Sequence, residues 1–155
     1  MRNAIKSKLI VLFTVLMAGC SNLGIYEVTQ VTSNPSQLTI AKDSKTRKSV
    51  LPILEKWAFE NGYDVKTIDN YVMAERNEYT LTYRVWWGWD VASYMKKAEM
   101  KVLKDGVAVG SLKFDATEYG AFGKFGDAED RLNILMDVLF NKITVAEGNK
   151  RAGDA

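Results

Sequence analysis

The residues best suited to specific binding lie together in the stretch 86–90, which reads Trp-Trp-Gly-Trp-Asp and is followed closely by a tyrosine. Tryptophan faces stack on sugar rings or grip a protein partner, and a carboxylate accepts a hydroxyl or holds a cation. The other interpretation is a corner of the hydrophobic core, which is the commoner role of aromatic residues. Both interpretations stay open. The candidate binding residues are Trp87, Trp89, Asp90 and Tyr94.

Composition excludes several kinds of chemistry. The chain has no histidine and one cysteine, so it lacks a Ser-His-Asp triad, a Cys-His dyad, an imidazole metal site and a thiolate zinc site. Carboxylates such as Asp90, Asp115 and Glu118 are the remaining acid–base candidates, and a glycosidase would need two of them at a defined separation. We therefore predict no catalytic residue, no metal and no cofactor, and we favour a protein that is not an enzyme.

The charge of the chain differs between its ends. Lys and Arg number 21 against 19 Asp and Glu, but residues 1–19 hold Arg2, Lys6 and Lys8 and no acid. Removing that segment leaves 18 basic against 19 acidic residues. A nearly neutral body has no electrostatic footprint for nucleic acid, so we expect no nucleic-acid partner.

The first twenty residues have the pattern of a secretory signal. A positive segment is followed by the uncharged, mainly apolar run 9–18, which is too short to span a bilayer comfortably. The run closes with Met-Ala-Gly-Cys over 17–20, which resembles the lipobox of bacterial lipoproteins except that Met17 stands where Leu is commonest. The other interpretation is a buried cysteine behind an ordinary signal peptide or an uncleaved anchor.

The lipobox resemblance implies cleavage before Cys20 and a lipid anchor on that residue. The anchor would consist of a diacylglycerol thioether and an acylated amino terminus, with palmitate among the chains, and several acyl chains hold a protein on a membrane permanently. Ser21 stands where Asp would favour inner-membrane retention, which implies the periplasmic face of the outer membrane. Residues 21–24 then form a very short tether, so the body should lie close to the lipid headgroups.

Periodicity predicts the elements of the mature chain. Alternating residues predict strands over 25–32, 78–87, 94–104 and 107–114, with 38–40 and 63–68 as further extended segments. Apolar residues three and four apart predict a helix that begins after Ser49 and stops at Gly62, and a second from Asp127 to near Ile143. The segment 117–126 reads as a glycine-containing loop whose spacing matches no phosphate-binding motif.

An Asp-Gly pair at 105–106 predicts a two-residue hairpin between the last two strands. In that register Leu112 and Phe114 would point away from the core, so we expect a β-bulge at Gly110-Ser111 to turn them back. The fold class is α+β, a two-layer sandwich with an antiparallel sheet of about four to five strands covered on one face by two helices. The expected organisation is a signal peptide over 1–19, a lipidated Cys20 with its tether over 20–24, one domain over 25–146 and a polar tail over 147–155.

The second half of the chain resembles the Sbal-like lipoproteins, a family of small Gram-negative lipoproteins. The matching pieces are Tyr-Thr-Leu-Thr-Tyr over 79–83, Trp-Gly-Trp-Asp over 87–90, Ala-Ser-Tyr-Met over 92–95, Ala-Glu over 98–99, the Asp-Gly turn and Lys-Phe-Gly over 124–126. The resemblance implies a lipoprotein of the cell envelope and carries no functional residue with it.

These features predict an outer-membrane lipoprotein whose periplasmic domain is a non-catalytic binding or accessory module. Its expected partners are the membrane, through the lipid anchor, and an envelope protein or cell-wall glycan. The alternative is a glycan-binding or glycan-cleaving envelope protein that uses the aromatic cluster of residues 86–90 and Tyr94.

Overall fold

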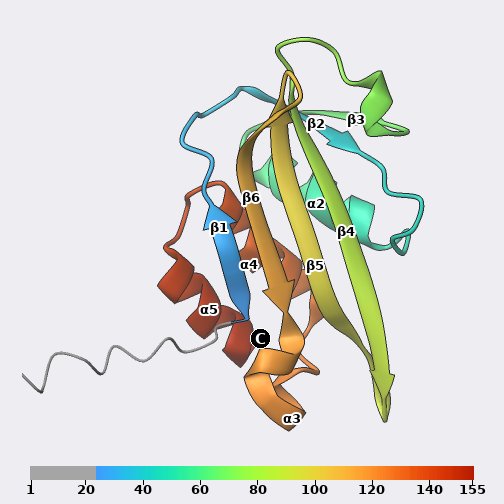
Figure 1. The fold of residues 1–155 in the computed structure, drawn as a ribbon, viewed down its shortest axis with the longest axis vertical. Helices are drawn as coiled ribbons and strands as arrows, with labels where there is room; N and C mark the ends of the chain where they lie inside the picture. The colour runs from blue at the N-terminus through green and yellow to red at the C-terminus, as the bar shows by residue number, and fades with distance from the viewer. Residues whose placement is uncertain (1–23) are drawn as a thin grey trace, which may run out of the picture.

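The computed structural model describes residues 24–155, so the expected signal peptide and Cys20 lie outside the described residues. Six strands form one mixed sheet in the order β1-β6-β5-β4-β2-β3, and helices lie against it (Figure 1). The α+β class is therefore confirmed, with more strands than expected. Within residues 24–155, none of the helices combines the length and the apolar character that crossing a bilayer requires.

The centre of the sheet is an antiparallel meander of three strands, β4 (Tyr79–Asp90), β5 (Ala92–Lys104) and β6 (Val107–Asp115). Alternation along β4 follows the prediction, since Leu81 and Val85 are buried while Arg84 and Trp86 lie on the other face. The sheet therefore has one apolar face and one polar face, as expected for an antiparallel sheet with a single covered side.

The remaining half of the sheet corrects the expected purely antiparallel arrangement. Strand β2 (Gln37–Ala41) pairs in parallel with β4 on one side and with β3 (Asp64–Ile68) on the other. Helix α2 (Val50–Glu60) lies between β2 and β3 in the chain. A helix between two strands carries the chain back to the starting edge of the sheet, so the second strand runs parallel to the first.

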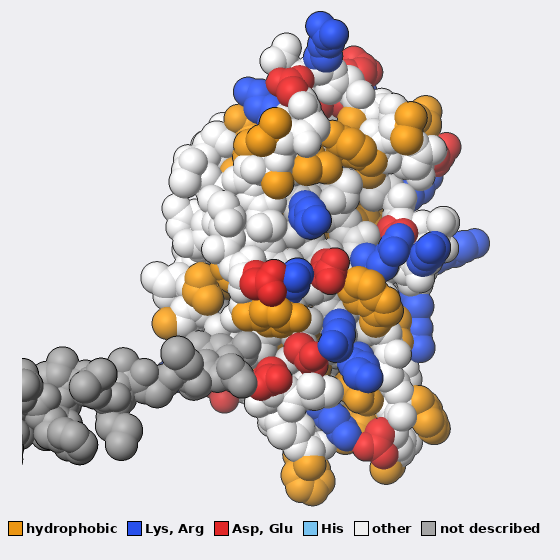
Figure 2. Space-filling view, viewed as in Figure 1, with side chains coloured by type: hydrophobic (Ala, Val, Ile, Leu, Met, Phe, Trp, Pro, Cys, Tyr) orange, Lys and Arg blue, Asp and Glu red, His pale blue; other side chains and the backbone are white. Residues whose placement is uncertain are grey.

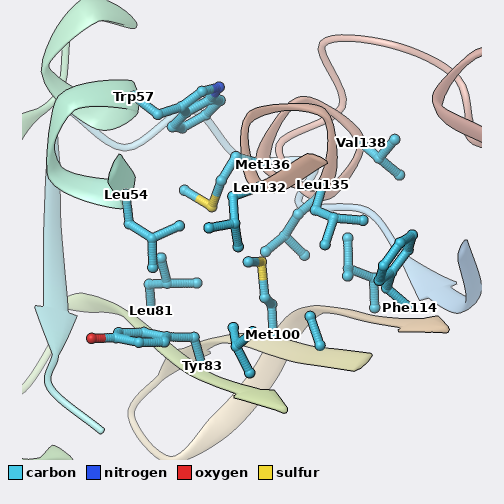
Figure 3. Packing of buried hydrophobic residues seen from close by; sticks show 14 of the residues in the cluster. Leu54, Trp57, Leu81, Tyr83, Met100, Phe114, Leu132, Leu135, Met136 and Val138 are labelled. Carbon is cyan, nitrogen blue, oxygen red and sulfur yellow. The ribbon is translucent and has the colours of Figure 1, made fainter. Parts of the chain in front are cut away.

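Two amphipathic helices cover the apolar face, as predicted. Helix α2 has Pro52 in its first turn and stops before Gly62, whose φ of 83° favours glycine. Helix α4 (Ala128–Leu139) begins at Asp127, whose side chain accepts a hydrogen bond from the backbone N–H of Asp130 at 2.9 Å. It ends earlier than expected. Figure 3 shows side chains of both helices facing those of the sheet, among them Leu54, Trp57, Leu132, Met136, Leu81, Met100 and Phe114.

The hairpin between β5 and β6 has the predicted turn. Asp105 and Gly106 both have positive φ, at 50° and 81°, which a type I′ turn requires. Val102 lies opposite Gly110 and Leu103 opposite Ala108, so Val109 is the extra residue of a bulge. The predicted bulge is confirmed one residue earlier than expected, and it places Leu112 and Phe114 in the core.

The expected polar tail over 147–155 is instead part of a helix, α5 (Val145–Asp154), packed beside β1 (Ile25–Thr29). The contact depends on Asn149, whose side chain accepts from the N–H of Ile25 at 2.8 Å and donates to its carbonyl oxygen at 3.2 Å. Asn149 thus pairs with an edge strand of the sheet as a neighbouring strand would. Its partner lies 124 residues earlier, which is why local sequence gave no sign of it.

Candidate functional site

The four candidate residues lie in the outer part of the β4–β5 hairpin. Both strands are long, with 12 and 13 residues, and the end where they meet extends past helix α2 (Figure 1). A register shift between Trp86 and Trp87 leaves Lys96 as an extra residue on β5. Such bulges bend and twist a strand, so the hairpin changes course at the aromatic cluster.

Trp87 lies on the core side of the sheet and is half-buried. The Arg47 guanidinium covers its ring at 4.0 Å from the centroid and donates a hydrogen bond to Ser93 Oγ at 3.1 Å. The indole Nε1 is buried and has no hydrogen-bond partner within the described residues. Because protein atoms already occupy its face, Trp87 is placed for packing rather than for stacking on a ligand.

Tyr94 belongs to the core. It is 8% exposed, and the ring of Phe125 meets it edge-on with centroids 5.3 Å apart. Across the hairpin, a Cβ added at Gly88 would lie 2.6 Å from the Tyr94 ring. The absence of a side chain at Gly88 therefore lets the tyrosine pack directly against the backbone of β4.

Asp90 is paired with a base. Lys124 Nζ lies 2.5 Å from Asp90 Oδ2, and this hydrogen bond raises the pKa of Lys124 above its usual range. The same ammonium group lies 5.5 Å from the Tyr94 ring centroid and 5.1 Å from that of Phe125. The pair ties the tip of the hairpin to the segment after α3 (Gly120–Gly123) and neutralises the carboxylate.

Trp89 is the candidate aromatic residue that is open to solvent, with 77% of its surface exposed. Two residues further along the chain, Val91 forms the turn between β4 and β5 and is 90% exposed. Its φ of 59° is rare for a β-branched residue and costs about 1–3 kcal/mol. The structure therefore places a strained, exposed, apolar residue where Asn or Gly would be comfortable.

Phe122, in α3, is 90% exposed. We define the apolar tip as Trp89, Val91 and Phe122. Sequence analysis singled out only Trp89. The sequence has a signal for each of the other two: Val91 is an apolar residue at a tight turn, and Phe122 is a phenylalanine between glycines. Neither signal predicts that the side chain is exposed unless the fold is known.

The uncovered face of the sheet carries a shallow hollow of about 320 Å³, lined by residues that include Arg84, Trp86 and Glu99. Arg84 is held by Asp43, with Nη2 and Oδ1 3.0 Å apart. Burial opposes ionisation of Asp43, but hydrogen bonds from Arg84 and Thr46 outweigh it and lower the pKa of the carboxyl. The Arg84 and Asp43 charges are therefore paired with each other.

Two further candidate carboxylates, Asp115 and Glu118, lie at the end of strand β6 and in the turn of helix that follows it. Asp115 accepts hydrogen bonds from Thr117 and lies 3.1 Å from Lys97 Nζ, and together these outweigh burial and lower its pKa. It is therefore ionised near neutral pH and is not suited to donate a proton. Glu118 is exposed in the neighbouring helix η2 (Ala116–Tyr119). Over residues 24–155 there is also no group of three or more acidic, histidine or cysteine residues placed to hold a metal ion.

Comparison with known proteins finds no match among protein-family models, curated proteins or solved structures.

Proposed function

We propose that the protein is a lipid-anchored lipoprotein of the outer membrane, whose periplasmic domain is a non-catalytic binding or accessory module. The observation that carries the proposal is the sequence Met-Ala-Gly-Cys over 17–20, placed after a basic segment and an apolar run. Strand β1 begins at Ile25, so the described fold starts five residues after Cys20. The resemblance to the Sbal-like lipoproteins agrees with this proposal.

A non-catalytic role is supported by the pairing of the carboxylates near the aromatic cluster with basic side chains. Asp90 is bound to Lys124, and Asp115 is bound to Lys97 and Thr117. A general acid needs a raised pKa and a base needs an accessible lone pair aimed at substrate. These carboxylates are instead engaged in contacts that stabilise the fold.

The anchor is tested by expressing the full chain and following labelled palmitate and membrane fractionation. We expect the wild type and Ser21→Ala to carry the label and stay with the membrane after a high-salt wash. Cys20→Ser, once secretion is confirmed, should lose the label and appear in the soluble periplasmic fraction. Ser21→Ala is the matched control because it alters the neighbouring residue and keeps the cysteine. Tight membrane association of an unlabelled Cys20→Ser chain would contradict the proposal.

The choice of membrane is tested at the next position. Ser21→Asp introduces the residue that favours inner-membrane retention, so it should move the lipidated protein from outer- to inner-membrane fractions on a density gradient. Ser21→Ala should stay in the outer-membrane fractions. Wild-type protein found in the inner membrane would refute the outer-membrane part of the proposal and leave the anchor intact.

The glycan-binding alternative is favoured by one observation, the exposure of Trp89. Trp87 lies under Arg47 and Tyr94 is buried, so a stacking platform would rest on a single ring. Glycan binding predicts saturable retention on cell-wall material that is lost in Trp89→Ala and kept in Phe59→Ala, a change of an exposed aromatic residue on helix α2. Equal retention of the two variants would rule the alternative out.

A further inference from the structure

Three exposed apolar side chains gather at one end of the molecule. Trp89 and Val91 lie at the end of the β4–β5 hairpin, and Phe122 lies in α3. The Lys124–Asp90 ion pair joins these two segments. In Figure 2 hydrophobic side chains project at the bottom of the view, where Figure 1 places α3 and the end of the hairpin. The apolar tip therefore comprises two separate protrusions held together at their bases.

The described chain begins about midway along the sheet, with the start of β1 facing the apolar tip. The carbonyl oxygen of Gly24 accepts a hydrogen bond from Asp115 N–H at 2.7 Å, and Gly24 lies against the ring of Tyr119, next to α3 in the chain. Strand β1 is antiparallel to β6, which runs toward the apolar tip. The amino end of β1 therefore faces the tip (Figure 1).

The number of residues between Cys20 and Gly24 limits how far the lipidation site can lie from the apolar tip. Gly24 lies at the level of Lys97 on β5, through Asp115, and Val91 is six positions before Lys97. Because Lys96 is the extra residue of a bulge, the distance corresponds to five strand steps, about 17 Å. Gly24 is the fourth residue after Cys20, and four steps of extended chain span at most about 14 Å. With the tether fully extended toward the tip, Val91 would still pass the level of Cys20 by about 3 Å.

We propose that the apolar tip is a membrane-contacting surface, and that Trp89, Val91 and Phe122 enter the headgroup region of the bilayer that holds the anchor. The inference rests on the proposed lipid anchor at Cys20. A tether that is less than fully extended brings the tip further past Cys20, toward the 5–10 Å to which interfacial apolar faces are buried in the headgroup and acyl boundary. The anchor and the tip then hold the domain at two separate points, which fixes its orientation on the membrane.

The chemistry of the tip suits a lipid surface. Tryptophan favours the membrane–water interface because its ring is apolar and its N–H can reach water. The acid next to Trp89 is Asp90, and its charge is neutralised by Lys124, so it does not repel anionic lipid. Lys96, exposed on β5, adds a base near the same end that can meet phosphate groups.

The opposite end of the sheet also exposes apolar residues, Val72, Met73 and Val107. It lies about 40 Å from the apolar tip, since the thirteen-residue strand β5 runs between the two ends. Strand β1 runs away from the tip and toward that opposite end, so a tether from Cys20 would have to turn back along β1 to bring the opposite end to the membrane. The direction of β1 therefore favours the apolar tip.

The chain supplies matched probe positions for a test. Val91 and Val72 are valines with exposures of 90% and 92% at opposite ends of the molecule, and Phe122 and Phe59 are phenylalanines with exposures of 90% and 76%. Cys20 is the only cysteine, and lipidation would consume its thiol, so an introduced cysteine becomes the single reactive thiol. The variants are Val91→Cys, Val72→Cys, Phe122→Cys and Phe59→Cys.

Each full-length lipidated variant is labelled with an environment-sensitive fluorophore and reconstituted into phosphatidylethanolamine–phosphatidylglycerol vesicles, with and without nitroxide lipids. We expect labels at 91 and 122 to shift to shorter wavelength and to be quenched several-fold more strongly by the nitroxide lipids than labels at 72 and 59. Equal behaviour at all four positions would overturn the inference. A shift at 91 and 122 without lipid quenching would also overturn it, because it would indicate a second copy or another protein as the occupant.

Failure of the proposed anchor is recognised separately. The intact mass of each purified protein and its release by a high-salt wash are measured before labelling. A chain that carries no lipid and washes off the membrane overturns the proposed function, and this inference with it. A lipidated chain whose tip stays in water overturns this inference alone.

Discussion

Replacing Asn149 by alanine tests the contact that holds the first strand to the last helix. The side chain accepts from Ile25 N–H and donates to Ile25 C=O, and it also accepts from the Tyr119 hydroxyl at 3.1 Å. Ile25 is 2% exposed, so water does not readily replace the lost partner. A buried backbone group left without a partner costs about 1–3 kcal/mol, and two such groups are created. We expect Asn149→Ala to lower the free energy of unfolding by about 2–6 kcal/mol.

The assay is urea unfolding of residues 21–155, followed by tryptophan fluorescence, with Asn133→Ala as the matched control. Asn133 is also in a helix, is half-buried and has no side-chain hydrogen bond within the described residues. Both substitutions gain the same small amount of helix propensity, so the difference between them isolates the hydrogen bonds of Asn149. An unchanged m value would show that the unfolded surface is comparable. Equal midpoints for the two variants would refute the reasoning and leave the packing of α5 on β1 without support.

Three further outcomes follow from single positions. A Cβ at Gly110 would lie 2.4 Å from Val31 Cγ2, so Gly110→Ala should lower the free energy of unfolding by about 1–3 kcal/mol. The double variant Gly110→Ala with Val31→Ala should recover part of that loss, because the second change removes the methyl group in the way. The pKa of Asp43 is lowered below its ordinary 3.8, so its ion pair with Arg84 stabilises the fold above pH 3.8 and this stabilisation is lost as the pH falls through the lowered pKa. In urea unfolding measured over the acid range, Asp43→Asn should not show this loss of stability. Val91→Asn should raise the free energy of unfolding by about 1 kcal/mol in urea, because Asn adopts positive φ more readily than valine; an unchanged or lower value would show that Val91 is not strained.

The elements that sequence predicted well are those specified by neighbouring residues. Helix α4 begins at Asp127 because a carboxylate there can cap the backbone N–H three residues on, and this depends on nothing outside the segment. The Asp105-Gly106 turn and the bulge after it are also specified by nearby residues. The turn type fixes the register of the two strands, and a bulge is then needed to return Leu112 and Phe114 to the core.

The elements that sequence missed depend on distant partners. Helix α5 has few apolar residues, and its place in the fold comes from the pairing of Asn149 with Ile25. The parallel pairing of β2 with β3 and β4 required knowing which strands become neighbours, which alternation alone does not specify. The helical connection between β2 and β3 was the available signal, because such connections join parallel strands.

In the candidate site, too, spacing along the chain predicts some features, and others depend on residues far away in the sequence. Trp87 and Trp89 are two residues apart, and alternation places both on one face of β4, yet one is covered and the other is open. Trp87 packs against the core, and Arg47, forty residues earlier, lies over its ring, whereas Trp89 is 77% exposed. Lys124 pairs with Asp90, and this ion pair joins the segment that holds Phe122 to the end of the hairpin that holds Trp89. Spacing along the chain does not contain these contacts.

The contact between the first strand, β1, and the last helix, α5, affects how firmly a tether could hold the domain in one orientation on a membrane. Asn149 holds β1 to α5, and β1 is the strand through which a tether from Cys20 would enter the fold. A short tether restricts the tilt of a domain only if the strand it joins is fixed, because a frayed β1 would lengthen the tether by several residues. Asn149→Ala should therefore weaken lipid quenching of the label at Val91→Cys as well as lower stability, whereas Asn133→Ala should leave that quenching unchanged. Quenching that persists in the Asn149 variant would mean that the apolar tip reaches the bilayer without help from a fixed first strand.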